Sequence, residues 1–267
     1  MIIGSVLARF NELELSTADD KRFKLKNNAL SRLALRMIGL PHLGFRKRAG
    51  IILGEALKNK KSGMKALDAG CGYGLYSLTL ADKGFDAIDS VDIDAGRVNE
   101  LQALIGEQPE LAARISPKVG SLTQLPFADK TYDLIICSEV IEHIADDSAA
   151  VRELGRVLKP GGTLLLSVPH DSAFNRRTYR RFDHQRPGYS KEMLARMFEP
   201  LGITIEMDAY YEFGPGVKLF NAFNAISSKP LMGILFYPMY ALYQLDSMLR
   251  IGEPSYIIVR ARKSLSA

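Results

Sequence analysis

The sequence predicts an α/β fold in which helices cover both faces of a doubly wound, mostly parallel sheet of seven strands. From residue 65 onward, short apolar runs typical of buried strands alternate with helical patterns. Such alternation is typical of helices that cross between parallel strands. The first apolar run ends in a glycine-rich turn, KALDAGCGYG at 65–74. A turn of this kind is expected to bind a ligand at the carboxyl edge of the sheet.

The predicted elements follow one another along the chain. Runs rich in aliphatic, β-branched and aromatic residues predict strands at 65–70, 86–94, 113–121, 131–140, 163–169, 203–212 and 255–263. Apolar residues spaced three and four apart predict helices at 75–84, 95–107, 146–159 and 190–202. We expect Gly84 to end the first of these helices, and Gly161 with Gly162 to end the third. Ser190 is expected to cap the start of the fourth.

Two segments lie outside this alternation and divide the chain. Residues 1–64 form a basic, partly helical extension, and residues 65–267 form the main domain. This domain carries an insertion at 213–254 that is rich in Phe, Tyr, Met and Leu. The longest uncharged apolar run, 231–245, contains a proline and is shorter than the roughly 20 residues that span a membrane.

Charge and cysteine content narrow the possible settings. The net charge is +5, but residues 1–65 hold 14 Lys or Arg against 5 Asp or Glu. A basic segment on a mildly acidic body indicates either an anionic partner surface or a solvated helix pair. Cys71 and Cys137 are the two cysteines of the chain, too few for a disulfide framework. The N-terminus also lacks the pattern of a signal peptide, so we expect a cytoplasmic protein.

The glycine turn does not match the common nucleotide fingerprints. Its pattern is Asp68-x-Gly70-x-Gly72-x-Gly74. The third glycine of a G-x-G-x-x-G fingerprint is missing, and the chain contains no G-x-x-x-x-G-K-[ST] loop. Glycines in this turn let the backbone lie directly against a ligand.

Four ordered blocks resemble one enzyme family. DAGCGYG resembles motif I of the class I methyltransferases that use S-adenosylmethionine, and SVDID at 90–94 resembles the end of their second strand. The block at 120–144, GSLTQLPFADKTYDLIICSEVIEHI, is similar to the type-11 methyltransferase domain of the ubiquinone and menaquinone methyltransferases. The stretch RELGRVLKPGGTLLLSVP at 152–169 resembles the block that follows there. The resemblance implies a Rossmann-like fold, S-adenosyl-L-methionine as cofactor and methyl transfer as the reaction.

The resemblance also implies a set of cofactor-binding residues. Asp92 is expected to accept hydrogen bonds from the ribose hydroxyls, with Asp94 as the competing candidate. Ser121 stands where the family often has an acid that contacts the adenine, so adenine recognition is expected to rest partly on the backbone at Leu122. The full predicted set is Asp68, Gly70, Cys71, Gly72, Gly74, Asp92, Ile93, Ser121, Leu122, Ser138, Glu139 and His143.

Candidates for substrate chemistry are fewer. His170 ends a predicted strand and His184 lies in a loop facing the same edge, so either could act as a general base, although a lone histidine is commonly structural. No paired His/Cys spacing is present, so we expect no metal. The cluster Arg176, Arg177, Arg180, Arg181 and Arg186 either binds an anionic group such as a lipid phosphate or solubilises a loop.

The two outlying segments bear on the acceptor. A basic amphipathic stretch at 29–48 and the apolar insertion favour a lipid-like or lipid-linked acceptor at an anionic membrane surface, with peripheral attachment. Both segments could equally be core or subunit contacts. The alternatives are a soluble small-molecule or sugar O-methyltransferase and, third, an RNA methyltransferase or a non-catalytic cofactor-binding protein. No RNA-binding signature accompanies the basic segment, so nucleic acid is not the expected partner. The sequence makes no prediction of oligomeric state.

Overall fold

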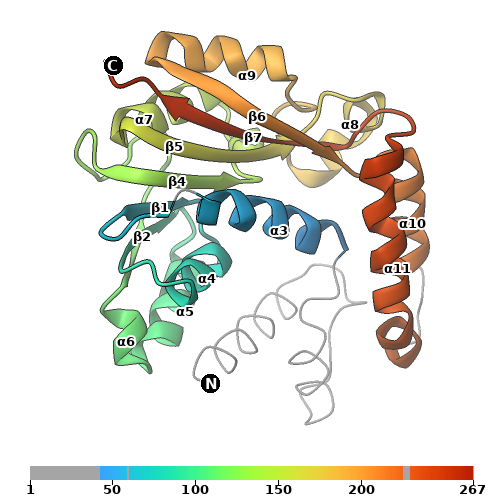
Figure 1. Cartoon of the computed structure of the whole chain (residues 1–267), viewed down its shortest axis with the longest axis horizontal. Coiled ribbons are helices and arrows are strands. Elements are labelled where there is room, and N and C mark those ends of the chain that lie inside the picture. Colours follow the sequence, from blue (N-terminus) through green and yellow to red (C-terminus); the bar gives the residue numbers. More distant parts are fainter. Residues whose placement is uncertain (1–42, 59, 225–228, 267) are drawn as a thin grey trace.

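The core of the protein is one seven-stranded sheet. The computed structural model describes residues 43–58, 60–224 and 229–266 (Figure 1). The strands are β1 (Lys65–Ala69), β2 (Ala87–Asp92), β3 (Ile115–Val119), β4 (Tyr132–Ser138), β5 (Leu158–Pro169), β6 (Ile203–Tyr211) and β7 (Tyr256–Lys263). Their order is β3-β2-β1-β4-β5-β7-β6; β7 runs antiparallel to β5 and β6, and the other pairs of neighbours are parallel. The predicted mostly parallel, seven-stranded α/β fold is confirmed.

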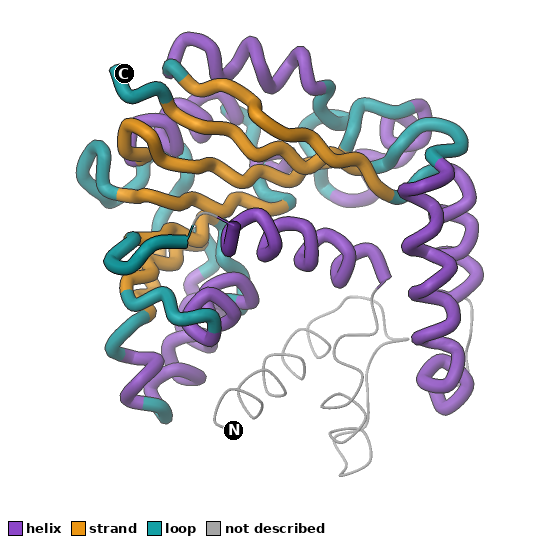
Figure 2. The backbone as a smooth tube through the Cα atoms, in the orientation of Figure 1, coloured by secondary structure: helices purple, strands orange, loops and turns teal. Residues whose placement is uncertain are grey.

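Helices cover both faces of the sheet (Figures 1 and 2). One face packs against α3 (Leu43–Lys58), α4 (Leu75–Asp82) and α5 (Ala95–Gly106), and the other against α7 (Asp147–Val157) and α9 (Lys191–Phe198). The shorter helices are α6 (Pro109–Ala112) and α8 (Ala173–Thr178), with 3-10 turns η2 (Ile141–His143), η3 (Tyr179–Phe182) and η4 (Glu199–Leu201). Because both faces are covered, the central strands β1 and β4 are almost continuously buried, as their unbroken apolar runs predict.

We expected the Gly161-Gly162 pair to end a helix, but it does not. Helix α7 ends at Val157, and β5 begins at Leu158, so both glycines lie inside the strand. Leu158 already pairs with Tyr132 across the sheet, and the Lys159 ammonium lies 2.7 Å from the Asp133 carboxylate. Sheet pairing therefore overrides the local glycine signal. The other predicted caps hold: Gly84 follows α4 with φ 78°, and the Ser190 side chain accepts from the amide of Met193.

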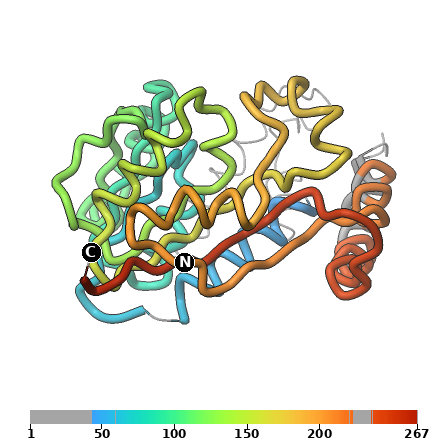
Figure 3. Tube along the Cα trace, turned by 90° about the horizontal axis from the view of Figure 1, so that it is seen from above, coloured from blue at the N-terminus to red at the C-terminus, as the bar shows by residue number. Residues whose placement is uncertain are grey.

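Two helices of the insertion stand at one end of the molecule. They are α10 (Gly214–Asn224) and α11 (Lys229–Leu249), which lie side by side in both views (Figures 1 and 3). Since β6 runs parallel to β5 and leads directly into α10, this pair lies at the carboxyl edge of the sheet. Among the described residues, no helix is long and apolar enough to cross a membrane.

The N-terminal extension contributes to the core where it is described. Leu43 and Ile52 of α3 have no exposed surface, and Ala49 and Ile52 belong to the apolar cluster beneath β1, β2 and β4. The domain boundary at residue 64 stays a prediction. Most of the basic stretch at 29–48, including His42, lies outside the described residues.

Candidate cofactor and active site

The predicted cofactor residues follow the carboxyl ends of four neighbouring strands. Ser121 follows β3, and Asp92 with Ile93 lies at the end of β2. The glycine turn follows β1, and Ser138 with Glu139 lies at the end of β4. Because these strands are parallel, all four ends meet at one edge of the sheet. Ligands in open α/β sheets bind at this edge, where the strand order reverses. The reversal here lies between β1 and β4, directly at the glycine turn.

The glycine turn has room for a ligand at one position only. Gly70, Gly72 and Gly74 all have positive φ, where glycine is favoured. A Cβ on Gly70 would overlap Val140, and one on Gly74 would overlap Leu101. A Cβ on Gly72 would meet no atom within 4 Å. Gly70 and Gly74 are thus required by packing inside the protein, whereas Gly72 borders open space, as expected where a cofactor lies against the backbone.

Asp68 holds the turn together from below. It is buried, and its Oδ2 accepts from the Ser77 amide (3.0 Å) and the Ser77 hydroxyl (2.6 Å) at the start of α4. Burial raises the pKa of Asp68 to about 6, although both hydrogen bonds from Ser77 act to lower it. Its membership of the cofactor site remains a prediction. These contacts fix α4 against β1.

Asp92 and Asp94 have separate roles in the structure. The Asp92 carboxylate accepts from the Gly72 amide at 2.8 Å and from the Asp94 amide at 3.0 Å, which ties the tip of β2 to the glycine turn. The Asp94 carboxylate caps α5 by accepting from the amides of Gly96 and Arg97. Both carboxylates accept backbone amides, but only Asp92 is tied to the glycine turn, so Asp92 remains the predicted partner of the ribose.

The residues expected around the adenine differ in exposure. Ile93 directly follows Asp92 and is 74% exposed, which leaves an apolar surface for a flat ring. Leu122 is buried in the core, so only its backbone can serve recognition. The Ser121 hydroxyl lies 2.8 Å from that of Thr123, and accepts from the Thr123 amide at 3.2 Å. This local turn partly occupies the hydroxyl that was expected to face the adenine.

The tip of β4 carries a partly buried ion pair that the sequence did not predict. Arg48 of α3 lies 3.3 Å from the Glu139 carboxylate, whose other oxygen accepts from the Ser167 hydroxyl at 2.7 Å. Burial is the largest influence and lowers the pKa of Arg48, but the charge of Glu139 and the neighbouring tyrosines together raise the pKa well above its usual value. Nearby, the hydroxyls of Tyr76 and Ser138 lie 3.2 Å apart. The basic stretch had suggested that Lys47 and Arg48 contact a membrane surface. Lys47 is buried and Arg48 is partly buried, so neither is an exposed membrane contact.

His184 and His143 are brought together, whereas His170 is not part of this group. The rings of His143 and His184 meet edge to face with centroids 4.8 Å apart, beside the buried Glu142. His170 instead packs edge to face on Tyr210 of β6, at 5.5 Å. Burial lowers the pKa of His170, so a neutral ring is favoured. A role of either histidine as general base stays a prediction.

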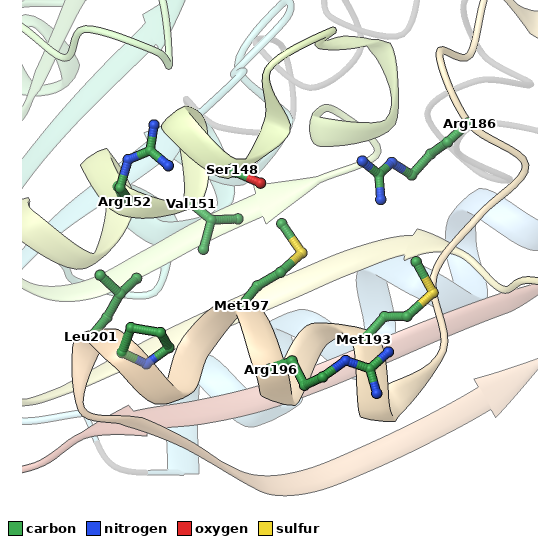
Figure 4. A pocket seen from close by; sticks show the side chains of 9 residues that line it. Ser148, Val151, Arg152, Arg186, Met193, Arg196, Met197 and Leu201 are labelled. Carbon is green, nitrogen blue, oxygen red and sulfur yellow. The ribbon is translucent and has the colours of Figure 1, made fainter.

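The arginine cluster is divided by its partners. Arg186 lies 2.6 Å from the buried carboxylate of Asp147, and Arg176 makes two hydrogen bonds of 2.8 Å with Asp171. Arg186 also borders an open groove of about 480 Å³ between α7 and α9, together with Arg152, Arg196 and two methionines (Figure 4). Both helices cover a face of the sheet. We therefore do not assign the groove to the cofactor.

The strand-end residues fit the cofactor that the sequence resemblance implies. S-adenosylmethionine supplies a methyl group bound to a sulfonium sulfur. Because the neutral thioether is a good leaving group, positioning of the acceptor supplies most of the catalysis. In this chain the backbone at Gly72 can lie against the ligand, and Asp92 is placed at the adjoining strand tip. Burial raises the pKa of the Cys71 thiol, so it stays neutral beside the turn.

Comparisons with known proteins identify the family of this chain. A family model described as "Methyltransferase domain" matches residues 67–166. A protein described as a probable S-adenosylmethionine-dependent methyltransferase from Mycolicibacterium smegmatis is 30% identical over 186 residues, 69% of each chain. A ubiquinone biosynthesis O-methyltransferase from Azorhizobium caulinodans is 30% identical over 167 residues, 61% of each chain. The fold is similar to the crystal structure of an S-adenosylmethionine-dependent methyltransferase from Mesorhizobium loti, with a TM-score of 0.58, 17% identity, and coverage of 83% of this chain and all of that one. The chain therefore belongs to the S-adenosylmethionine-dependent methyltransferases.

Proposed function

We propose that this methyltransferase acts on a hydrophobic, lipid-like or lipid-linked acceptor that it meets at an anionic membrane surface. The observation that carries the proposal is an apolar stripe on the outer face of α11. Its members recur three and four residues apart, as one helical face requires, and are all exposed. The stripe consists of Tyr237, Pro238, Ala241, Leu242, Leu245, Met248 and Leu249.

The stripe is both apolar and well exposed. Met248 is 78% exposed and Leu249 is 62% exposed, and neither Asp, Glu, Lys nor Arg interrupts the stripe. Continuous exposed apolar surfaces mark interaction sites. The stripe belongs to the helix pair that follows β6 at the carboxyl edge of the sheet, the edge that also carries the predicted cofactor residues.

A second surface of suitable chemistry lies on α8 and η3. Phe174 and Phe182 are 45% and 57% exposed, and Arg177 and Arg181 beside them are exposed as well. Aromatic side chains with neighbouring arginines suit the headgroup region of an anionic bilayer. Both α8 and α11 lie toward the same end of the molecule's long axis (Figures 1 and 3). The ubiquinone biosynthesis relative, whose name indicates a lipid-like product, supports the same class of acceptor.

Vesicle sedimentation tests the membrane part of the proposal. Full burial of a Leu or Met side chain contributes about 2 kcal/mol, so the exposed parts of Met248 and Leu249 would together contribute about 3 kcal/mol. Met248→Glu with Leu249→Glu should therefore weaken binding to anionic vesicles by at least about 100-fold. Leu265→Glu is the matched control, because Leu265 is 85% exposed near the C-terminus, outside the stripe. Wild-type protein that stays in the supernatant even at salt well below about 0.1 M, where exposed charges are least screened, would contradict membrane attachment.

A labelling experiment tests the acceptor. The protein is incubated with a membrane extract and a soluble extract, each supplied with methyl-labelled S-adenosylmethionine. We expect the label to enter a product that partitions into organic solvent. Label that appears only in water-soluble products would favour the soluble small-molecule or sugar O-methyltransferase. Absence of any transfer, with cofactor binding intact, would favour the non-catalytic alternative.

A further inference from the structure

Glu142 is a buried carboxylate for which no hydrogen-bond partner is found in the described part of the chain. It lies in η2, directly after the tip of β4, and is 1% exposed. Neither carboxylate oxygen has a hydrogen bond. Burial and then the charge of Glu139 raise the pKa of Glu142 well above its usual value. The backbone at Glu142 and Val140 and the charge of Arg48 offset this rise only in part. A buried carboxylate is costly, and such groups in native proteins are normally paired or bound to a metal.

Two imidazoles face this carboxylate. One ligand atom each from Glu142, His143 and His184 lies within 4.8 Å of the other two. The Nδ1 atom of His143 lies 3.3 Å from the carbonyl oxygen of Asp183. A carbonyl can only accept, so this contact assigns the proton to Nδ1 and leaves Nε2 with a free lone pair. A histidine that ligates a metal is usually held in this way, with its other nitrogen donating to a carbonyl or carboxylate.

His184 is also prepared to act as a ligand. Its Nδ1 atom is buried, with no hydrogen-bond partner among the residues that the structure describes. The amide of Gln185, the next residue, donates to the Glu142 carbonyl at 2.7 Å and ties this loop to η2. The two parts of the cluster are therefore held together although they are far apart in the sequence.

We propose that Glu142, His143 and His184 bind a divalent transition-metal ion of the zinc class. Two imidazoles and one carboxylate are a common ligand set for zinc, with a further coordination position left open. Imidazole ligands suit zinc and its neighbours better than magnesium, which prefers oxygen. At metal–ligand distances of about 2.1 Å the ligand atoms are about 3.4 Å apart, so the side chains draw together by about 1 Å on binding. A hollow of about 310 Å³ beside His184 gives the ion and a further ligand access.

The proposal revises the expectation that no metal is bound. That expectation rested on the absence of paired ligands in the linear sequence, whereas the fold brings His184 to the Glu142-His143 pair. It goes beyond the proposed acceptor and does not depend on it, since metal binding is measured without any methyl transfer.

Metal titration of the full-length, tag-free protein tests the site. The protein is stripped with a chelator and titrated with Zn²⁺ by calorimetry, and with Co²⁺ as a spectroscopic probe. We expect one Zn²⁺ per chain, and a visible Co²⁺ absorption that Zn²⁺ abolishes. Glu142→Gln and His184→Ala should each weaken Zn²⁺ binding at least about tenfold. Loss of a group that only hydrogen-bonds to a metal ligand already lowers metal affinity about 10- to 100-fold. His170→Ala removes a comparable imidazole outside the cluster and should leave Zn²⁺ binding unchanged.

Several outcomes would overturn the proposal. These are a wild-type protein that takes up no Zn²⁺, cluster variants that bind it as the wild type does, or millimolar Mg²⁺ that displaces it. Circular dichroism and binding of S-adenosylhomocysteine show that each variant is folded. His184→Ala lies in a surface loop, so it provides the test even if Glu142→Gln fails to fold. A protein that binds Zn²⁺ but ignores vesicles would refute the membrane proposal and leave the metal site standing.

Discussion

Gly72→Ala should separate cofactor binding from stability more cleanly than any other change in the glycine turn. A Cβ on Gly72 meets no protein atom within 4 Å, whereas a Cβ on Gly70 would overlap the side chain of Val140. Both glycines have positive φ, 53° and 77° respectively. The two alanine variants therefore share the conformational strain and differ in what the added methyl group meets.

The magnitudes follow from this difference. A left-handed conformation costs a non-glycine residue about 1–2 kcal/mol. In a chain of this size each kcal/mol lowers the melting temperature by about 2–4 °C, so Gly72→Ala should lose about 2–8 °C. Gly70→Ala should lose more, because overpacking adds about 1–3 kcal/mol. If the cofactor lies against Gly72, the same overpacking falls on the complex and weakens binding by about 5- to 150-fold.

Calorimetry with S-adenosylhomocysteine measures the affinity without turnover, and a thermal melt of the same sample measures stability. The expected result for Gly72→Ala is a modest loss of melting temperature with a large loss of affinity. Unchanged affinity together with the expected fall in melting temperature would show that the open space at Gly72 is not where the cofactor lies. Gly70→Ala serves as the comparison in which stability falls further.

Three further changes give definite expectations. Asp92→Ala should weaken cofactor binding by about 1.5–3 kcal/mol. Asp94→Ala should instead remove about 1 kcal/mol of stability, because it deletes the helix cap, and leave the cofactor affinity unchanged. Calorimetry that finds weaker binding for the Asp94 variant and not for the Asp92 variant would exchange their roles. Burial raises the pKa of Glu212 to about 7, so the folded protein holds a proton that the unfolded chain releases. Relative to Glu212→Gln, wild-type stability should be greatest below about pH 4.5 and fall by about 3 kcal/mol as pH rises to about 7; urea unfolding that shows a constant difference at pH 5 and pH 8 would contradict this. Arg48→Met should destabilise by about 1–3 kcal/mol because it leaves the partly buried Glu139 carboxylate without its charged partner, and adding Glu139→Gln should recover most of the loss in denaturant melts.

The sheet could be predicted because its signals are local. Each buried strand is an apolar run, and each helix has its own periodicity and cap, as at Asp94 and Ser190. The glycine turn could be predicted for the same reason. Gly161 and Gly162 were misinterpreted because their conformation is decided by pairing with β4 and β7, which local sequence does not show.

The buried charges could not be predicted in this way. Lys47 and Arg48 looked like surface residues of a basic helix, because periodicity treats any charge as exposed. Lys47 is buried and Arg48 is partly buried, since they find partners on α11 and at the tip of β4, far along the chain. Glu142 was passed over in favour of His143, and the nearness of His184 depends on a loop 40 residues away. The signal for Glu142 was present in the same block, but only its burial shows it to be unusual.

The orientation of α11 shows why its apolar stripe is a fixed feature of the fold. The inner face of this helix is polar: the Tyr243 hydroxyl donates to Glu212 at 2.7 Å, and Asp246 accepts from the amides of Phe213 and Gly216. The Lys47 ammonium donates to the Tyr243 carbonyl at 3.1 Å and lies over the Tyr243 ring.

A rotation of α11 that buried the apolar stripe would break these contacts. The partners of Asp246 would remain buried, and a buried polar group that loses its partner costs about 1–3 kcal/mol. The network therefore holds the polar face inward and the apolar face outward. Burial alone would favour the opposite arrangement. A surface kept apolar in this way is better explained by contact with a hydrophobic phase than by incomplete packing.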